Sequence, residues 1–166
     1  MNKLLTILLL IPLISFGQSE IDDLIEVGDA KYELEDYSGA IADYTKAIEL
    51  DPEYESAYRS RGTSKYNLED YSGAIEDYTK AIEINPEYAY AHSMRGASKY
   101  NLDSYSSAIE DLNKAIELDP EDSYSYYFRG LAKESLGYSN GACSDWEKSA
   151  ELGDTDAATL VTENCN

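Results

Sequence analysis

The sequence predicts an all-α protein, a solenoid of four helix–turn–helix units with a capping helix at its C-terminal end. One observation is the even spacing, 34 residues, of three prolines: Pro52, Pro86 and Pro120. A second is the motif YSGAI at residues 37–41, which returns at 71–75 and, as YSSAI, at 105–109. A fixed period of this length indicates one supersecondary unit that is copied and stacked. Stacked units expose a concave face that usually binds a partner, so the repeat predicts a binding module.

Each unit is expected to contain two helices. With the proline at position 32, the units are 21–54, 55–88, 89–122 and 123–156. Helix A covers roughly the first 14 positions and helix B roughly positions 18 to 31, because apolar residues recur there at helical spacing. The turn between the helices is rich in capping residues. Helix B ends where it does because the residue before a proline is pushed out of the α region.

The fourth unit departs from this pattern. Gly153-Asp154 replaces the usual Asp-Pro pair, and Cys143 takes the place of a repeated isoleucine. The residues that follow, Thr155 to Cys165, are expected to form a short helix, and we assign the cap to residues 157–166. A solenoid needs such a cap because an uncovered last unit would leave an apolar face in water.

Small and large residues recur at fixed positions. Position 8 is glycine and position 20 is alanine in every unit, while position 24 is large: Tyr44, Tyr78, Leu112 and Trp146. Over residues 21–156 this pattern resembles the tetratricopeptide repeat family. The resemblance implies a right-handed α-solenoid in which the small residues let helix A approach helix B, while position 24 fills the wedge between units. The fourth unit is also similar to the Sel1-like relatives of the family.

One departure from the family is an arginine at position 7, where leucine is usual. It occurs in three units, as Arg61, Arg95 and Arg129, while the first unit has Val27. An aspartate recurs at position 23, on the other helix: Asp43, Asp77, Asp111 and Asp145. An arginine at a packing position is costly unless it is paired, so we predict structural ion pairs. The alternative is an arginine ladder that grips acidic ligands.

Residues 1–17 have the pattern of a secretory signal peptide. Lys3 is followed by a 13-residue apolar run, Leu4 to Phe16, and Ser15-Phe16-Gly17 supplies small residues for cleavage. The run is shorter than the roughly 20 residues that span a bilayer. We therefore expect cleavage after Gly17, export to the periplasm or beyond the cell, and a mature repeat domain, residues 18–166, that does not insert into a membrane.

Charge limits the class of partner. The 166-residue chain has a formal net charge of −20, and loss of Lys3 makes it −21 because residues 1–17 contain no Asp or Glu. A field of this sign repels phosphate backbones and anionic lipids, so nucleic acid is not the expected partner. We interpret most of the acid as a solvated convex face. Attraction of basic peptides would require acid inside the groove.

The two cysteines, Cys143 and Cys165, are expected to form a disulfide because they belong to an exported chain. Cys143 lies near the start of helix B of unit 4 and Cys165 near the end of the cap, so antiparallel helices would bring the thiols together. A redox pair is less favoured because there is no C-x-x-C motif. The only histidine, His92, stands at a packing position and is interpreted as part of the core.

The sequence shows no constellation that indicates catalysis. One histidine and two distant cysteines do not make a zinc site of the usual kinds. There is no glycine-rich phosphate loop. The carboxylates fall at repeat-periodic positions, whereas a catalytic site is distinct and non-repeating. We therefore expect no enzymatic activity, no metal and no cofactor.

In the family, the groove is lined mainly by helix A positions 2, 5, 6, 9, 12 and 13. These positions are acidic in unit 1 and aromatic in units 3 and 4. The candidate ligand-binding residues are Arg59, Tyr66, Asn67, Tyr90, Tyr100, Asn101, Tyr124 and Tyr127. Tyrosine offers rigid contact area, and asparagine amides can hold a peptide backbone. About half of the tyrosines are expected to pack between units instead. The Lys/Asn clamp with which some relatives grip C-terminal carboxylates is not matched.

The favoured hypothesis is an exported, non-enzymatic scaffold that binds a peptide or helical segment of another protein in its tyrosine-rich groove. The partner is expected to place an apolar or aromatic anchor at the C-terminal end and basic residues near Asp22, Glu26 and Asp29. The alternative is an extracytoplasmic glycan- or small-molecule-binding protein, because aromatic rings also stack on sugars. A third hypothesis is an enzyme or redox protein that uses Cys143 and Cys165.

Overall fold

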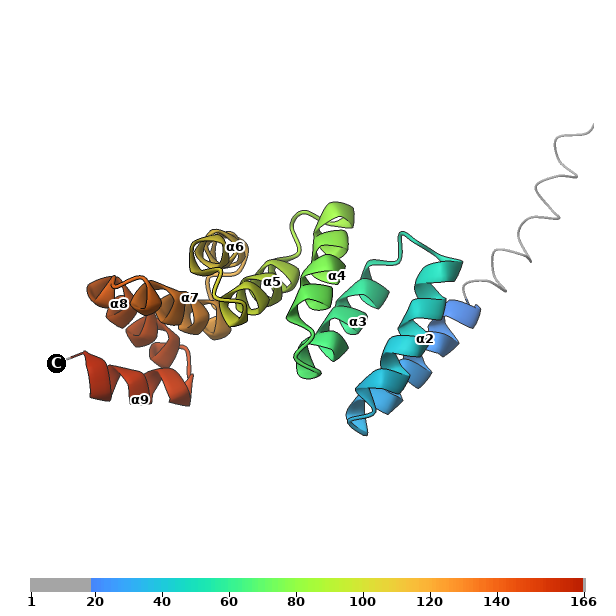
Figure 1. The fold of residues 1–166 in the computed structure, drawn as a ribbon, viewed down its shortest axis with the longest axis horizontal. Helices are drawn as coiled ribbons and strands as arrows, with labels where there is room; N and C mark the ends of the chain where they lie inside the picture. The colour runs from blue at the N-terminus through green and yellow to red at the C-terminus, as the bar shows by residue number, and fades with distance from the viewer. Residues whose placement is uncertain (1–18, 166) are drawn as a thin grey trace, which may run out of the picture.

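The computed structural model describes residues 19–165, which form a series of helices joined by short turns (Figure 1). The predicted signal peptide, residues 1–17, lies outside the described residues. Residues 19–33 are helical. The helices that follow are α2 (Tyr37–Leu50), α3 (Glu55–Asn67), α4 (Tyr71–Ile84), α5 (Ala89–Asn101), α6 (Tyr105–Leu118), α7 (Ser123–Ser135), α8 (Ser139–Glu151) and α9 (Thr155–Asn164). No strand occurs between residues 19 and 165, which confirms the predicted all-α fold for this range.

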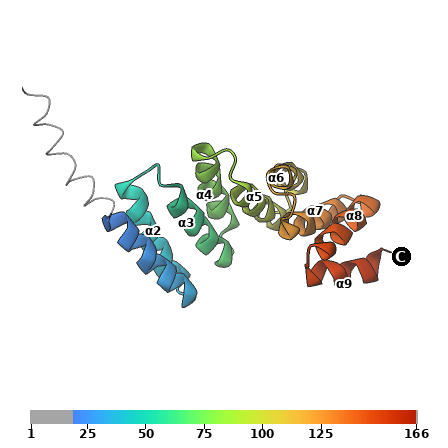
Figure 2. The same ribbon diagram turned by 180° about the vertical axis from the view of Figure 1, so that it is seen from behind.

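Consecutive helices pack in pairs, as the repeat predicts. The pairs α3–α4, α5–α6 and α7–α8 each form one unit, and the helix over residues 19–33 lies beside α2. Each pair contacts the next, and α9 covers α8 at the C-terminal end. Figures 1 and 2 show the pairs following one another along an elongated array. The predicted solenoid with a capping helix is therefore confirmed.

Local signals account for where helix B begins and ends. Oδ1 of Asp70 accepts a hydrogen bond from the backbone N–H of Gly73 at 3.0 Å, which caps the start of α4. Asp36 caps α2 in the same way through Gly39, at 2.9 Å. At the other end of α4, Asn85 is extended, with φ −131° and ψ 93°, because it precedes a proline. These caps and stops give α2 and α4 the same length, 14 residues each.

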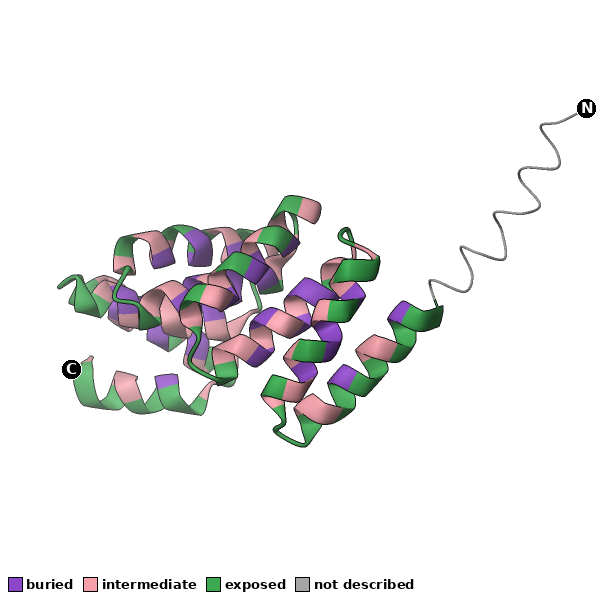
Figure 3. Ribbon diagram, turned by 45° about the vertical axis from the view of Figure 1, so that its right-hand side comes forward, coloured by how far each residue is buried: buried purple, intermediate pink, exposed green. Residues whose placement is uncertain are grey.

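The core depends on close contact between helix A and helix B of each unit. The large residues at position 24 are almost completely buried: Tyr44, Tyr78, Leu112 and Trp146. Gly130 in α7 lies directly against Trp146 in α8, and a Cβ atom there would fall 2.4 Å from Nε1 of the indole. Figure 3 shows the buried residues on the helix sides that face neighbouring helices. The packing implied by the family resemblance is confirmed.

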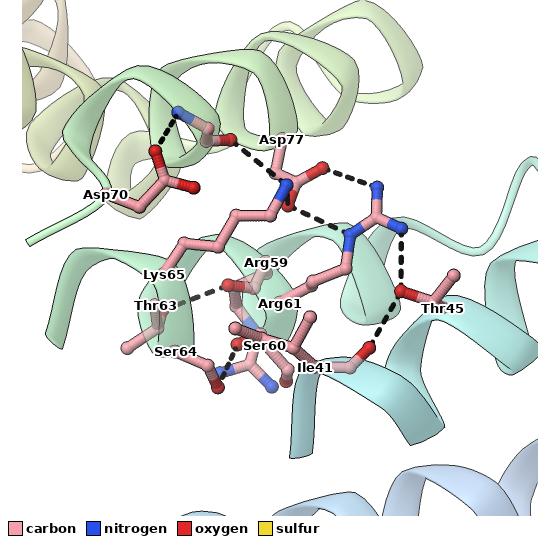
Figure 4. A network of polar contacts seen from close by, with 11 residues as sticks. Ile41, Thr45, Arg59, Ser60, Arg61, Thr63, Ser64, Lys65, Asp70 and Asp77 are labelled. Atoms are coloured by element: carbon pink, nitrogen blue, oxygen red, sulfur yellow. Dashed lines mark hydrogen bonds and ion pairs between the residues drawn. The ribbon is translucent and has the colours of Figure 1, made fainter. Parts of the chain in front are cut away.

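The repeated arginines form ion pairs across the two helices of one unit, and Figure 4 shows the pair in unit 2, Arg61 with Asp77. Arg61 in α3 donates from Nε and Nη2 to the carboxylate of Asp77 in α4, at 3.0 and 2.6 Å. Its Nη1 donates to Oγ1 of Thr45, on helix B of the preceding unit, at 3.1 Å. Lys65 contacts the same aspartate at 2.9 Å. The arginine therefore joins the helices of its own unit and also ties that unit to the one before it.

The same arrangement recurs in units 3 and 4, with the pairs Arg95–Asp111 and Arg129–Asp145. In unit 1, where Val27 replaces the arginine, Lys31 and Lys46 hold Asp43 instead. The predicted structural ion pairs are therefore present in units 2, 3 and 4.

The C-terminal end is closed by α9 and a disulfide. Cys143 in α8 and Cys165, which follows α9, are bonded, with their Cα atoms 5.6 Å apart. Apolar residues of both helices pack around Trp146, among them Ala142, Ala157 and Val161. The predicted disulfide is present in the structure, and it fixes the end of the cap to the last unit.

His92 is buried, as expected for a packing position. Its Nε2–H donates to the carbonyl oxygen of Pro86 at 3.1 Å, because a carbonyl oxygen can only accept. Nδ1 lies 3.9 Å from the carboxylate of Asp111. The histidine thus belongs to the core beneath the Arg95–Asp111 pair.

Candidate functional site: the groove between the A helices

The A helices meet along one face of the solenoid, where α3 contacts α5 and α5 contacts α7. Two hollows lie on this face. The first hollow, of about 300 Å³, is lined by Asp29, Tyr32, Glu33, Tyr44, Arg59, Ser60, Thr63 and Tyr90. The second hollow, of about 440 Å³, is lined by Tyr32, Thr63, Tyr66, Asn67, Ala89, Tyr90, Ser93, Met94, Asp119, Asp122 and Tyr124.

Three residues line both hollows and join them into one groove: Tyr32, Thr63 and Tyr90. The hydroxyls of Thr63 and Tyr90 lie 3.2 Å apart, and Tyr78 donates to Oγ1 of Thr63 at 3.2 Å. Tyr90 is 38% exposed, whereas the other tyrosines that line the hollows are half-buried or buried. It therefore stands at the centre of the groove with its ring accessible.

Asparagines tie unit 2 to unit 1 and unit 3 to unit 2 along the groove. Nδ2 of Asn67 donates to the hydroxyl of Tyr32 at 2.9 Å, and Nδ2 of Asn101 donates to the hydroxyl of Tyr66 at 3.0 Å. We call these two contacts the asparagine rungs. Asn101 also donates to the carbonyl oxygen of Ala97 at 3.0 Å, so both of its amide protons are used. Asn101 therefore has only its amide oxygen to offer a peptide backbone, whereas Asn67 keeps one amide proton.

An aromatic cluster around Phe128 forms the C-terminal part of this face. The ring of Phe128 lies 4.5 Å from that of Tyr124, 5.3 Å from that of Tyr127 and 5.5 Å from that of Tyr100, measured between centroids. The hydroxyls of Tyr124 and Tyr66 are 3.2 Å apart. Burial, followed by the hydrogen bond to Tyr66, raises the pKa of the Tyr124 phenol. The Tyr124 phenol therefore remains neutral and can exchange hydrogen bonds with a ligand without changing charge.

The predicted site residues divide into two groups. Arg59, Tyr66, Asn67, Tyr90 and Tyr124 line the two hollows. The other three, Tyr100, Asn101 and Tyr127, line neither of them. Tyr100 packs against the cluster of Ala108 and Leu112, and Tyr127 packs against the cluster of Trp146. Ligand binding by either group stays a prediction, but the first group has the accessible geometry.

The prediction omitted several residues that line the hollows. Tyr32, Thr63 and Met94 stand at helix A positions 12, 9 and 6, so the family pattern could have selected them. Asp122 lies in the loop before α7, where no helical pattern points to the groove. Its carboxylate accepts hydrogen bonds from the hydroxyls of Ser93 and Ser125, at 2.8 and 2.6 Å. Asp122 therefore links α5 to α7 where both helices border the second hollow.

The N-terminal end of the groove is acidic. Asp22, Glu26 and Asp29 are exposed on the helix over residues 19–33. Asp29 accepts a hydrogen bond from the hydroxyl of Tyr44 at 2.7 Å. The groove therefore changes along its length, from exposed carboxylates in unit 1 to aromatic rings in units 3 and 4.

The groups present in the groove are those of a binding surface: hydroxyls, amides, aromatic faces and fixed charges. Between residues 19 and 165, no three His, Cys, Asp or Glu side chains gather where they would hold a metal ion. In the same range, no helix has the length and apolar character needed to cross a membrane.

Comparison with known proteins identifies relatives of the fold. The family described as TPR repeat matches residues 28–69 and 62–103, and the family described as Tetratricopeptide repeat matches residues 89–122. No curated protein matches the sequence. MamA is similar with a TM-score of 0.77 and 23% identity, over 89% of this chain and 87% of MamA. MamA from Desulfovibrio magneticus RS-1, residues 41 to its end, is similar with a TM-score of 0.75 and 23% identity, over 80% of this chain and 75% of that one. The first TPR of Spaghetti (RPAP3), bound to the HSP90 peptide SRMEEVD, is similar with a TM-score of 0.70 and 25% identity. The match covers 72% of this chain and 94% of the RPAP3 domain.

Proposed function

Because the chain belongs to the tetratricopeptide repeat family, we propose that it is a non-enzymatic scaffold that holds a segment of another protein in the groove between its A helices. The observation that carries this proposal is the pair of adjoining hollows, joined by Tyr32, Thr63 and Tyr90. The RPAP3 domain, which has the same kind of fold, is bound to a peptide of HSP90. That likeness supports a protein segment as the ligand.

The second hollow accepts the anchor of the partner. Tyr66, Tyr90, Met94 and Tyr124 offer an apolar surface edged by hydroxyls. An aliphatic or aromatic side chain gains free energy by leaving water for such a surface, and tyrosine contacts it at low entropic cost. Basic residues of the partner face the exposed carboxylates at the N-terminal end of the groove.

The protein acts outside the cytoplasm in this proposal. Residues 1–17 have the signal-peptide pattern, and the disulfide between Cys143 and Cys165 suits an oxidising compartment. Mass spectrometry of protein from its native host should find a terminus at Gln18. An intact Met1 on the soluble protein contradicts export and leaves the binding proposal intact.

Site-specific photocrosslinking tests the binding proposal. A benzoylphenylalanine at position 90 should capture a partner protein in the native cell. The same group at Glu76, which is exposed on α4, is the matched control and should capture none of it. Equal capture by both positions rejects the groove as the binding site. Absence of protein capture together with binding on a glycan array favours a glycan-binding protein instead.

A further inference from the structure

Nearly every positive side chain of the described chain is already neutralised by a neighbour. Eleven of the twelve lysines and arginines between residues 19 and 165 form an ion pair with an Asp or Glu. The twelfth is Arg59. Its guanidinium forms neither an ion pair nor a side-chain hydrogen bond with any residue in that range. This is notable in a chain with a net charge of −20, where carboxylates are abundant.

Arg59 lies in the groove. It is half-buried in α3 and lines the first hollow beside Ser60, Thr63 and Tyr90. Its charge acts on the groove: burial raises the pKa of the Tyr44 and Tyr90 phenols, which line the first hollow, and the positive charge of Arg59 opposes that rise. The guanidinium is therefore directed at the space a ligand would fill and is not engaged in holding helices together.

The position of Arg59 also sets it apart from the other arginines. Position 7, with Arg61, Arg95 and Arg129, repeats and always faces an aspartate. Position 5, in contrast, does not repeat and carries four different residues: Ile25, Arg59, Ser93 and Tyr127. Repetition marks a structural task common to all units, so a non-repeating charge in the groove indicates recognition.

The opposite wall of the first hollow carries Asp29 and Glu33. The hollow thus presents both signs of charge, with the arginine on α3 and the carboxylates on the helix over residues 19–33. A doubly charged phosphate would be repelled by these carboxylates and by the net charge of the chain. A carboxylate with a cation beside it complements both walls.

We propose that Arg59 binds an acidic side chain, Asp or Glu, within the partner segment. A basic residue next to that acid faces Asp29 and Glu33, and an apolar residue on its other side enters the second hollow. A guanidinium suits this role because its planar fork donates two parallel hydrogen bonds to one carboxylate. The inference rests on the proposed function, and it adds the order basic, acidic, apolar along the groove from unit 1 to unit 3.

Selection from a random peptide library tests this order. The mature, oxidised protein selects from peptides flanked by fixed sequence at both ends, so no free terminus contributes a carboxylate. The wild type should enrich peptides with an acid at a fixed distance from an apolar residue. Arg59→Gln should keep the apolar preference and lose the acidic one, and Arg59→Glu should select Lys or Arg in its place. Lys80→Gln, which removes an exposed cation of α4, should select the same peptides as the wild type.

Titration of one selected peptide makes the test quantitative. Replacing its acid by the amide should weaken binding to the wild type about tenfold, the size of one hydrogen-bonded charge contact. The same replacement should leave binding to Arg59→Gln unchanged. Because Arg59 forms no ion pair or side-chain hydrogen bond between residues 19 and 165, this variant should melt like the wild type. If the selected peptides show no acidic position, the proposal for Arg59 is wrong, but the proposal that the groove binds a protein segment is retained. If the wild type enriches no peptide, both proposals fail.

Discussion

Arg95 and Asp111 are joined by two parallel hydrogen bonds, Nε to Oδ2 at 2.8 Å and Nη2 to Oδ1 at 2.6 Å. Lys99 approaches the same carboxylate at 2.8 Å, and Nη1 of Arg95 donates to Thr79 at 3.1 Å. The guanidinium on α5 therefore contacts α6 of its own unit and α4 of the preceding one. A charge that would be costly alone is stabilised by this geometry and becomes a connection between units.

Removing Arg95 should destabilise the fold. Arg95→Ala leaves a buried Asp111 with Lys99 as its remaining strong partner, so we expect a loss on the order of 3 kcal/mol in the free energy of unfolding. Lys114→Ala is the control, because its pair with Glu117 is exposed and should contribute about 0.5 kcal/mol or less. Urea denaturation measures both. An Arg95→Ala protein as stable as the wild type that no longer binds its partner would assign the arginine to the ligand.

The same pair predicts a pH dependence. Burial alone would raise the pKa of Asp111, but the hydrogen bonds from Arg95 and Lys99 outweigh it and hold that pKa below its ordinary value. A depressed carboxyl pKa contributes stability that is present above the unfolded-state pKa, about 3.9, and is lost as pH falls through the folded-state value. The difference in urea midpoint between wild type and Asp111→Asn should therefore shrink below about pH 4. Surface acids titrate in both proteins, so the difference isolates this pair; a difference that is equal at pH 7 and pH 3 contradicts the prediction.

Glycine at position 8 should resist enlargement. In Gly130→Ala the new Cβ would lie 2.4 Å from the buried indole of Trp146, so the two helices must move apart. We expect a loss of roughly 1–3 kcal/mol, as for other overpacked cores. Gly141→Ala, in α8, meets only the flexible side chain of Lys133 at 3.3 Å and should be neutral or gain up to about 1 kcal/mol. Thermal melting of the two variants compares a packing glycine with an ordinary helical one.

The disulfide should stabilise the cap. Cys143 and Cys165 are 22 residues apart, and closing a loop of this length contributes roughly 3 kcal/mol in the chain-entropy model. Cys143→Ser should therefore lower the melting temperature, and reduction of the wild type should lower it by a similar amount. Thiol titration of unreduced mature protein should find no free thiol, whereas two titratable thiols in protein from an oxidising compartment would contradict the bond.

Two groove tyrosines should behave differently. Tyr90→Ala removes an accessible ring from both hollows and should weaken partner binding by about 2 kcal/mol with little change in stability. Tyr127→Ala should lower stability as well, because Tyr127 packs against the cluster of Trp146. Isothermal titration and thermal melting separate the two effects. Glu76→Ala is the control and should change neither partner binding nor stability. If it weakens binding as much as Tyr90→Ala does, the groove is not the binding site.

The period made most of the fold predictable. It places Arg61 and Asp77 sixteen residues apart in the same register as two further pairs, Arg95–Asp111 and Arg129–Asp145. These contacts follow from the backbone of the repeat alone. Caps and prolines then set the helix ends, so helix positions were predictable to within a residue or two at each end.

The exposure of individual tyrosines was not predictable in the same way. Tyr66 and Tyr100 both stand at position 12, yet Tyr66 lines the second hollow and Tyr100 packs against Phe128. The difference arises from position 6 of the next unit, which is Met94 beside Tyr66 and Phe128 beside Tyr100. A repeat fixes where a side chain starts, but the volume of a non-repeating neighbour decides whether it remains accessible. Loop residues such as Asp122 carry no periodic signal at all.

The asparagine rungs give the array a mechanical property. They tie unit to unit on the groove side, while the bonds from Arg61 to Thr45 and from Arg95 to Thr79 tie the same units on the side of helix B. Bending the array in either direction lengthens one of these two sets of bonds. We therefore expect units 1 to 3 to hold their curvature before any ligand arrives. The ordering cost of association then falls on the incoming chain, which must adopt the spacing of the units.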